Sequence, residues 1–283
     1  MNRGLLRGTL HALTIDVEDW HHPLLIRGGA DSSISLIQEP TERLLDMLGE
    51  RRIRATFFIV GELAQRFPDL IAAIAGAGHE IGCHTHGHAA LCELTPEEFD
   101  EELQRAEAAI AGACGIRPVC FRGPSFGLCP DTRWMTEVLA RRGYRVDSSL
   151  LPSRFAMAGW AGAPRGPFEL APGLWEIPAT TSPFLRMPYG GSVYLRVWPR
   201  WLIRFWVRAN ERRGLPSMFY LHPWELLATL PPTPGVEPGR WVTLWRQRRF
   251  ESLLHWLLDT YSFTSLGEAF APLMGAGSGR GFS

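Results

Sequence analysis

"RATFFIVGELAQRFPDLIAAIAGAGHEIGCH", residues 54–84, contains a strand, a helix and a second strand in succession. The first part, "RATFFIV", is a short apolar run rich in β-branched and aromatic residues, which is typical of a strand buried on both faces. The middle part predicts a helix that breaks at Pro68, because proline cannot continue a helix, and that ends at Gly76 and Gly78. "HEIGCH" is the second strand. Two strands joined through a helix are expected to lie parallel.

The same alternation continues on both sides of this unit, from Leu10 to about Ser149. On the N-terminal side, "LHALTIDVE" predicts a strand and "EPTERLLDMLGERR" a helix. On the C-terminal side, the expected helix, strand, helix and strand are "TPEEFDEELQRAEAAIAGACG", "VCFRGP", "PDTRWMTEVLARRG" and "YRVDSS". Such regular alternation indicates the α/β class, with a parallel sheet or barrel.

The pattern is looser after Leu150, where Pro, Gly and Trp become frequent. We predict a loop over 152–173, a strand at "LWEIPA", a helix over 199–213, a strand at "SMFYLHPWE" and a helix over 240–261. The expected parts of the chain are a barrel-like region (8–225, with a regular core over 10–150 and a looser closing part over 151–225), a helical extension packed on it (226–274) and a disordered tail (275–283). The tail, "GAGSGRGFS", has almost no apolar content to bury.

The composition restricts the partners and the compartment. Lys+Arg and Asp+Glu are both 29, so no excess charge favours nucleic acid as a partner. The five cysteines are odd in number and lack CxxC spacing, which favours free thiols in a reducing compartment. Residues 1–11 lack a signal-peptide core, and no run of about 18 apolar residues occurs. We therefore expect a soluble, cytoplasmic protein.

Polar side chains gather where the predicted strands end. The carboxyl ends of parallel strands meet at one edge of a sheet or one mouth of a barrel, and sites form there. The residues at these ends are Asp16, Glu18, Asp19, the segment 84–88, Arg122, Asp147 and His222.

The segment "HTHGH" carries histidines at alternate positions. If it continued the strand, His84, His86 and His88 would share one face; if the chain turns into a helical bend after Cys83, His84 and His88 form an i, i+4 pair and His86 points away. Thr85 and Gly87 favour the bend. Two imidazoles with a carboxylate from another strand would form a site for Zn²⁺ or a similar divalent ion. The alternative is a loop held by hydrogen bonds.

The acidic cluster "DVEDW" offers a metal ligand and a general base, although acids after a strand also serve as caps or loop residues. Arg122 would keep such a base ionised by lowering its pKa, or form a purely structural ion pair. His222 follows a buried strand, where a histidine is either a core residue or, at this mouth, a general acid.

These segments together resemble the polysaccharide deacetylase family (NodB homology domain, carbohydrate esterase family 4). "TIDVED" resembles its first motif, "HTHGH" matches the second, "FRGPSFG" resembles the third, "VDSS" the fourth, and "YLHPW" matches the fifth. The expanded first motif, "RGPSFG", "PYGG" and "HPWEL" resemble the subgroup linked to bacterial exopolysaccharide loci with the PEP-CTERM/exosortase system. The resemblance implies an incomplete or distorted (β/α) barrel of about seven parallel strands with a C-terminal extension.

The resemblance also implies an activity and its residues. The activity is hydrolysis of N-acetyl groups on amino sugars, in an exopolysaccharide or its lipid-linked precursor, with a divalent metal such as Zn²⁺ (or Co²⁺, Ni²⁺ or Mn²⁺). Carried over by position, Asp16 is the base, Arg122 orients it, His84 and His88 bind the metal, and His222 is the acid. The substrate residues would be Ser125, Phe126, Asp147 and Trp224, with a backbone N–H near Ser125 holding the oxyanion.

The metal carboxylate is a choice between Glu18 and Asp19, because Val17 separates the base from both. Strand alternation puts Glu18 on the side of Asp16. A bulge after Val17 would deliver Asp19, which we favour slightly for its shorter side chain and its position in a loop.

Other functions remain open at this point. The same chemistry would suit an amidase or deformylase acting on a small or lipid-linked substrate, and a non-catalytic glycan-binding protein would keep the fold. In the helix 199–213, arginines recur every four residues while the apolar residues gather mainly on another side. This helix is expected to pack on the barrel or to contact the inner face of a membrane peripherally.

Overall fold

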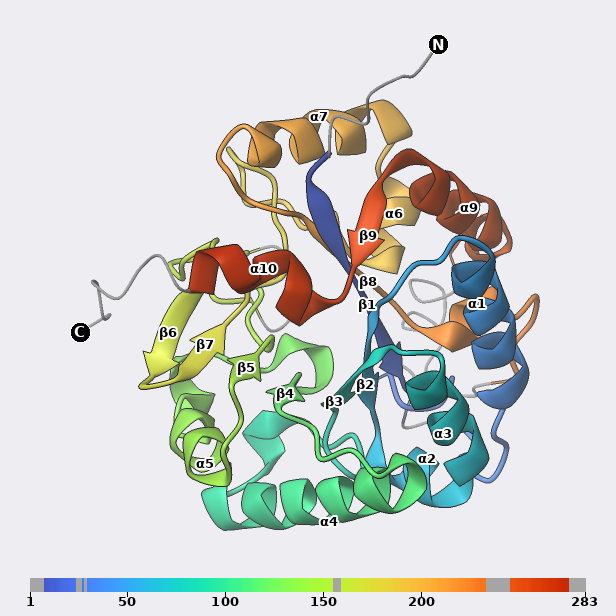
Figure 1. The fold of residues 1–283 in the computed structure, drawn as a ribbon, viewed down its shortest axis with the longest axis vertical. Coiled ribbons are helices and arrows are strands. Elements are labelled where there is room, and N and C mark those ends of the chain that lie inside the picture. Colours follow the sequence, from blue (N-terminus) through green and yellow to red (C-terminus); the bar gives the residue numbers. More distant parts are fainter. Residues whose placement is uncertain (1–7, 24–26, 28–29, 155–158, 233–244, 275–283) are drawn as a thin grey trace.

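The computed structural model describes residues 8–23, 27, 30–154, 159–232 and 245–274. Its centre is a curled, mostly parallel sheet with the strand order β6-β7-β5-β4-β3-β2-β1-β8 (Figure 1). The strands are β1 (Leu10–Val17), β2 (Thr56–Ile59), β3 (Glu80–Cys83), β4 (Cys120–Phe121), β5 (Val146–Asp147), β6 (Phe168–Ala171), β7 (Leu174–Glu176), β8 (Met218–Leu221) and β9 (Ser262–Thr264). All described pairings are parallel except that of β6 with β7. The half-barrel predicted from the sequence, with seven parallel strands from β7 to β8, is confirmed.

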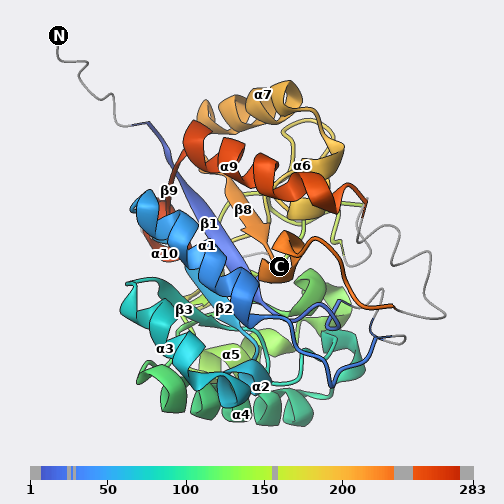
Figure 2. The same cartoon turned by 90° about the vertical axis from the view of Figure 1, so that its right-hand side faces the viewer.

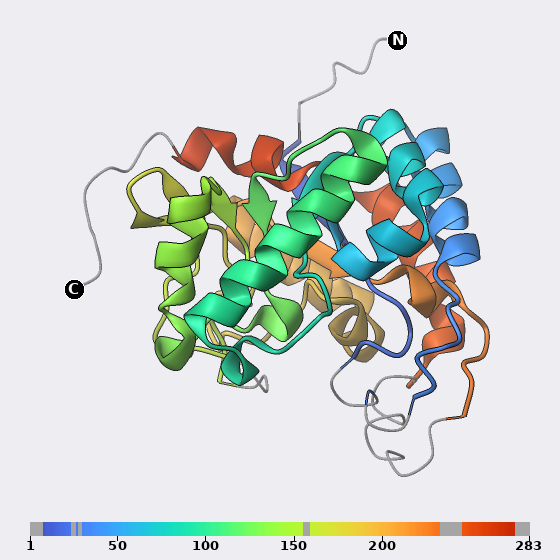
Figure 3. The same cartoon turned by 90° about the horizontal axis from the view of Figure 1, so that it is seen from below.

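Helices cover the outside of the sheet, except that α10 packs against the inner apolar cluster. They are α1 (Gln38–Glu50), α2 (Gly61–Arg66), α3 (Pro68–Gly76), α4 (Pro96–Cys114), α5 (Met135–Arg142), α6 (Ser192–Val197), α7 (Arg200–Glu211), α9 (Phe250–Thr260) and α10 (Leu266–Met274). Figure 2 shows α1, α9 and α7 in a layer beside β1 and β8, and Figure 3 shows α4 crossing the outside of the sheet between α5 and the pair α2 and α3. No helix in the described ranges is long and apolar enough to cross a membrane.

The unit at residues 54–84 folds as its sequence predicts. β2 is buried along its whole length and pairs in parallel with β3. The expected helix is divided into α2 and α3 at Phe67, immediately before Pro68, where the backbone leaves the helical region (φ −130°, ψ 58°). The residue before a proline avoids the helical conformation, which accounts for the division.

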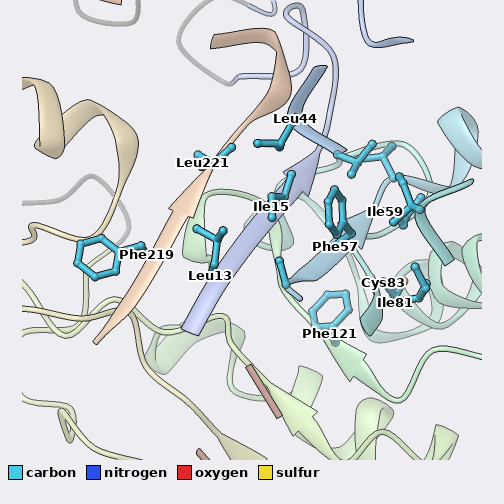
Figure 4. Packing of buried hydrophobic residues seen from close by; sticks show 14 of the residues in the cluster. Leu13, Ile15, Leu44, Phe57, Ile59, Ile81, Cys83, Phe121, Phe219 and Leu221 are labelled. Atoms are coloured by element: carbon cyan, nitrogen blue, oxygen red, sulfur yellow. The ribbon is translucent and has the colours of Figure 1, made fainter. Parts of the chain in front are cut away.

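The central strands separate two apolar clusters. Leu13, Ile15 and Val17 of β1 pack outward with the helices in the larger cluster, part of which Figure 4 shows. Alternate positions on β1 point into the barrel, where Ala12 joins the smaller cluster. Asp16 shares this inner side, so the strand itself carries the predicted base toward the interior.

The C-terminal extension contributes to the sheet as well as covering it. β9 pairs with the first residues of β1, and α10 packs Leu266 and Phe270 into the inner cluster. The predicted helix over 240–261 is α9 in its described part, and the predicted loop over 152–173 ends in β6, which the sequence did not predict. The proposed domain boundaries stay predictions, and the tail at 275–283 lies outside the described residues.

Candidate active site

The polar residues that follow the strands converge at the carboxyl edge of the sheet. Asp16 and Glu18 come from β1, His84 and His88 follow β3, Arg122 follows β4, and His222 follows β8. All are buried except for the His222 side chain, of which 19% is exposed. His222 therefore marks the side of the group that solvent reaches.

Arg122 holds Asp16 by one of its two carboxylate oxygens. The guanidinium Nη1 donates to Asp16 Oδ1 at 2.7 Å and to Thr14 Oγ1 at 2.8 Å. The guanidinium also lies over the Phe58 ring at 4.2 Å, and Arg122 is fully buried. Asp16 Oδ2 lies 3.9 Å from His222 Nε2. One oxygen is thus fixed by charge, while the other faces the centre of the site.

Glu18, His84 and His88 present ligand atoms that all lie within 4.8 Å of one another. Glu18 Oε2 is 2.5 Å from His88 Nε2 and 3.8 Å from His84 Nε2. His84 Nδ1 lies 2.6 Å from the carbonyl oxygen of Arg122 and must therefore carry the proton that it donates. The lone pair of His84 consequently sits on Nε2, the atom that faces Glu18, as a metal ligand requires.

His88 also fits a metal. Among the described residues neither ring nitrogen has a hydrogen-bond partner, although the ring is buried and Glu18 is close. Burial lowers the pKa of His88 to about 4 and outweighs the opposing effect of Glu18, so its ring is neutral at neutral pH. Burial opposes ionisation of Glu18, but His88 and His222 hold its pKa well below the usual range. One anion and two neutral imidazoles suit a divalent cation.

The histidines meet because the chain bends sharply after β3. Thr85 (φ 60°) and His88 (φ 55°) both lie in the left-handed region, so the bend is not a helical turn. His86 points elsewhere, toward Gly61, where an added Cβ would lie 2.6 Å from His86 Nδ1. The chain bends after Cys83 and brings His84 to His88 as expected, but the bend is not the helical one that was predicted, and the strand does not continue.

Asp19, which the sequence slightly favoured as the metal carboxylate, lies outside this group. Its oxygens accept hydrogen bonds from the backbone N–H groups of Trp20 and Leu36 and from the Ser35 hydroxyl. β1 pairs with β2 in unbroken register through Val17, where the strand ends, and Asp19 is turned toward these donors. The structure therefore places Glu18, on the side that strand alternation gives it, with the two histidines.

A second group, His21, His22 and Glu62, also has ligand atoms within 4.8 Å of one another. His22 Nδ1 accepts the backbone N–H of Asp19 at 2.9 Å, so the ring proton sits on Nε2 and is donated to Glu62 Oε1 at 2.8 Å. This tautomer is the opposite of that of His84 and leaves no lone pair on Nε2 for a metal. The His22 ring instead stacks on His88, with centroids 5.2 Å apart and planes 14° apart. The sequence analysis missed His22.

His222 is held by two residues that the sequence analysis also missed. Its Nδ1 lies 3.2 Å from Glu225 Oε2, and Glu225 Oε1 accepts from Arg196 Nη2 at 2.8 Å in a buried ion pair. His222 Nε2 faces Glu18 Oε1 at 3.6 Å. Burial alone would lower the pKa of His222, but Glu18, Glu225 and Asp16 outweigh it and raise the pKa to about 9. The only signal in the sequence was the glutamate in "HPWE".

Three of the four expected substrate residues, all except Ser125, are buried within the protein. Trp224 is 2% exposed; its Nε1 lies 3.4 Å from Glu18 Oε1 and its ring stacks on His222, so no face is open to a sugar. Asp147 is fully buried beside Glu176 on the neighbouring strand and accepts from the Ser149 hydroxyl. Phe126 packs beneath the Arg122 guanidinium. Ser125 is exposed at the rim and in the left-handed region (φ 55°).

A curled parallel sheet with paired acids, histidines and an arginine at its carboxyl edge defines an α/β enzyme of the half-barrel type. Residues 29–146 match the family model of polysaccharide deacetylases, and the chain contains a polysaccharide deacetylase domain of the NodB/carbohydrate esterase 4 type. Residues 148–271 match a second model, described as a domain of unknown function (DUF3473). Deacetylases of the first family are metalloenzymes.

Curated relatives resemble part of the chain. Over 101 residues it is 35% identical to the peptidoglycan-N-acetylglucosamine deacetylase of Bacillus cereus, which covers 35% of this chain and 36% of the relative. Over another 101-residue alignment it is 36% identical to the chitooligosaccharide deacetylase of Bradyrhizobium sp., covering 35% of this chain and 43% of the relative. The similarity thus spans less than half of either relative.

The fold has a counterpart among solved structures. A Mycobacterium smegmatis protein assigned to the polysaccharide deacetylases superimposes with a TM-score of 0.64. The superposition covers 96% of this chain and 92% of that one, at 21% sequence identity. The likeness therefore extends through the second half of the chain, where the half-barrel is completed.

Proposed function

We propose that the protein is a metal-dependent hydrolase that removes N-acetyl groups from the amino sugars of a glycan. The observation that carries the proposal is the position of Glu18, His84 and His88 beside Asp16, the one carboxylate fixed by Arg122. The named activities of the two curated relatives support an N-acetylglucosamine polymer as substrate. The resemblance to the exopolysaccharide subgroup favours an exopolysaccharide, or its lipid-linked precursor, as the particular glycan.

In this proposal Glu18, His84 and His88 hold a divalent cation, Zn²⁺ or a similar ion. The cation supplies Lewis-acid chemistry, which polarises the acetyl carbonyl and acidifies a water molecule. The protein contributes the orientation of the ligands: the Arg122 carbonyl fixes the tautomer of His84, and the His22 ring supports His88.

Asp16 is the proposed general base. Its Oδ2 is the oxygen that Arg122 leaves free, and it faces the centre of the site. The buried guanidinium holds the carboxylate in place, and its free oxygen can accept a proton from the attacking water. A backbone N–H near Ser125 at the rim is the proposed partner of the developing oxyanion.

His222 is the proposed general acid. Its raised pKa keeps the ring protonated at neutral pH, and Nε2 lies on the same side as Asp16 and Glu18. Glu225 occupies Nδ1, so the proton available to a departing amine is the one on Nε2. Glu225 acts through His222 and is a positioning residue, supported by Arg196.

Acetate release from N-acetylglucosamine oligomers, compared with simple amides and formamides, tests the proposal. We expect acetate from the oligomers, no turnover by Asp16→Asn with metal content retained, and loss of both activity and metal in His84→Ala. Near-normal turnover by Asp16→Asn would show that the base is assigned wrongly. Faster cleavage of the simple amides would point to an amidase or deformylase. Glycan binding with no turnover, even after metal is added, would point to a non-catalytic protein.

A further inference from the structure

The most exposed large apolar side chains of the described residues occur in two neighbouring segments. They are Phe184 (75% exposed), Leu185 (70%), Trp201 (68%) and Phe205 (50%). The first two form the tip of a turn over residues 182–187, and the other two lie one helical turn apart on α7. Singly exposed apolar residues are ordinary, but several together mark an interaction surface.

The turn is held against the C-terminal end of α7. Ser182 N donates to Met187 O at 2.8 Å and closes the turn. Asn210 Nδ2 of α7 donates to Thr181 O at 3.3 Å, and Arg213, just beyond the helix, donates to Pro183 O at 3.5 Å. The tip at Phe184 and Leu185 therefore lies beside the C-terminal end of α7, and we call the tip and the exposed side of α7 the docking surface.

The helix has an inner and an outer side. Ile203, Trp206 and Val207 are buried against the barrel. Trp201, Phe205, Arg208 and Arg212 follow one another at helical spacing along the outer side, and all are exposed. Figure 1 shows α7 along the outer edge of the molecule. Of the two expectations for residues 199–213, packing on the barrel is confirmed for the inner side of α7, and contact with a membrane stays a prediction.

The docking surface is also rich in positive charge. Arg165 and Arg213 donate to Pro183 O, and Arg186 donates to Ala163 O, so three guanidinium groups surround the tip. Within the described ranges no carboxylate lies within 4.0 Å of these arginines or of Arg208 and Arg212. Because the chain has equal numbers of acidic and basic residues, this local excess is a feature of the surface and not of the composition.

The turn over residues 182–187 lies away from the catalytic residues. Thr180, just before the turn, accepts a hydrogen bond from Met218 N, at the first residue of β8, whereas His222 follows the last residue of that strand. The turn is therefore at the amino edge of the sheet and the candidate active site is at the carboxyl edge. A partner on the turn leaves the mouth of the half-barrel open.

We propose that this surface docks the protein peripherally on a membrane containing anionic lipids. Trp and Phe side chains favour the interface between headgroups and acyl chains, and arginines beside them attract anionic headgroups. An acidic lipid surface would suit both the apolar tip and the guanidinium groups, which have no carboxylate partner among the described residues. The proposal does not depend on the catalytic function.

Vesicle flotation of the full-length protein tests the proposal. We expect binding to phosphatidylcholine vesicles that contain phosphatidylglycerol, weaker binding to phosphatidylcholine alone, and loss of binding at high salt. Phe184→Ser with Leu185→Ser, and Arg186→Ser with Arg213→Ser, should each weaken partitioning by about tenfold or more. The matched control is Ile116→Ser with Val119→Ser, which removes exposed apolar side chains between α4 and β4.

The outcomes separate lipid binding from misfolding and from self-association. Unchanged thermal unfolding would show that the variants fold. If the wild type releases acetate from a soluble N-acetylglucosamine oligomer, every variant should release it at the same rate. Equal flotation of the tip variant and the wild type would overturn the proposal. So would a wild type that ignores vesicles of both compositions, or a dimer that dissociates in the tip variant without any effect of lipid.

Discussion

The backbone carbonyl of Arg122 lies 2.6 Å from Nδ1 of His84, so the residue whose side chain holds the proposed base also fixes a proposed metal ligand. The two functions use different parts of Arg122: the guanidinium reaches Asp16, and the main chain reaches His84. A substitution of the side chain therefore separates them.

Arg122→Lys should keep the metal and lose activity. The carbonyl that orients His84 is unaffected by the substitution, whereas lysine cannot reproduce the planar guanidinium contacts with Asp16, Thr14 and Ser148. We expect acetate release to fall on the order of 100-fold, measured beside metal content by mass spectrometry. Loss of the metal along with activity would mean that the side chain, and not the carbonyl, supports the ligands.

Glu18 and Asp19 should differ in what their substitution removes. Glu18→Gln takes an anion from beside His84 and His88, so metal affinity should fall strongly while the fold remains. Asp19→Asn should bind metal normally but lower the free energy of unfolding by about 1–3 kcal/mol. The reason is that the amide accepts the hydrogen bonds donated by Trp20, Ser35 and Leu36 less well than the buried carboxylate does. Metal titration and urea unfolding distinguish the two; the reverse pattern would restore Asp19 as the ligand.

His22 should control how tightly His88 binds metal. Its ring is the flat neighbour of His88 and is anchored by Asp19 N and Glu62. His22→Ala should raise the dissociation constant of the metal about 10- to 100-fold. The dissociation constant of His22→Phe should lie between those of His22→Ala and the wild type. The matched control is His86→Ala, on the same bend but outside the group. A wild type that binds two metal ions, one of which His22→Ala loses, would contradict the tautomer assigned to His22.

The fold was predictable because its signals are local. Apolar runs such as Thr56–Ile59, the break before Pro68, and the spacing of apolar residues in α4 and α7 each reflect neighbouring residues alone. β6 escaped prediction because its side chains are half-buried or exposed and carry little apolar signal; pairing with β7 creates the strand.

The site was predictable only in part, for a related reason. Alternation along β1 correctly put Asp16 and Glu18 on one side. The position of Asp19 depends on Ser35, 16 residues away, and that of Glu225 on Arg196, 29 residues away, and nothing local encodes either contact. Trp224 was expected to bind substrate, but it packs with Trp20 and Leu230 in a small cluster that forms only in the folded chain.

The pair of His222 and Glu225 should be visible in a titration. In the metal-free protein, we expect the His222 ring to titrate with a pKa of about 9, followed by nuclear magnetic resonance. The folded pKa of His222 exceeds the unfolded value of about 6.5, so protonation of this ring stabilises the fold. The stabilisation is complete below about pH 6.5 and is lost as pH rises through about 9. Glu225→Gln should lower the pKa; Glu251→Gln, which changes an exposed carboxylate paired with Arg43, should not. An unchanged pKa in Glu225→Gln would assign the shift to Glu18 and Asp16 alone.

Asp147 and Glu176 should make the fold less stable as the solution becomes alkaline. Burial raises the pKa of Asp147 to about 6, and burial with the neighbouring Asp147 raises that of Glu176 well above its usual value. Carboxyl groups with raised pKa values favour folding while protonated, so this stability is present below about pH 4 and is lost as pH rises through about 6 and beyond. Glu176→Gln keeps the acceptor for Leu150 N and can donate to Asp147 Oδ2, which lacks a partner among the described residues.

The variant should therefore unfold in urea with less difference between about pH 5 and about pH 8 than the wild type does. Glu169→Gln provides the control, because this exposed β6 carboxylate also accepts a backbone N–H, that of Gly173, and should leave the pH dependence as it was. If Glu176→Gln kept the full dependence, the loss of stability would have to come from other groups, and the two carboxyls would not share a proton at neutral pH.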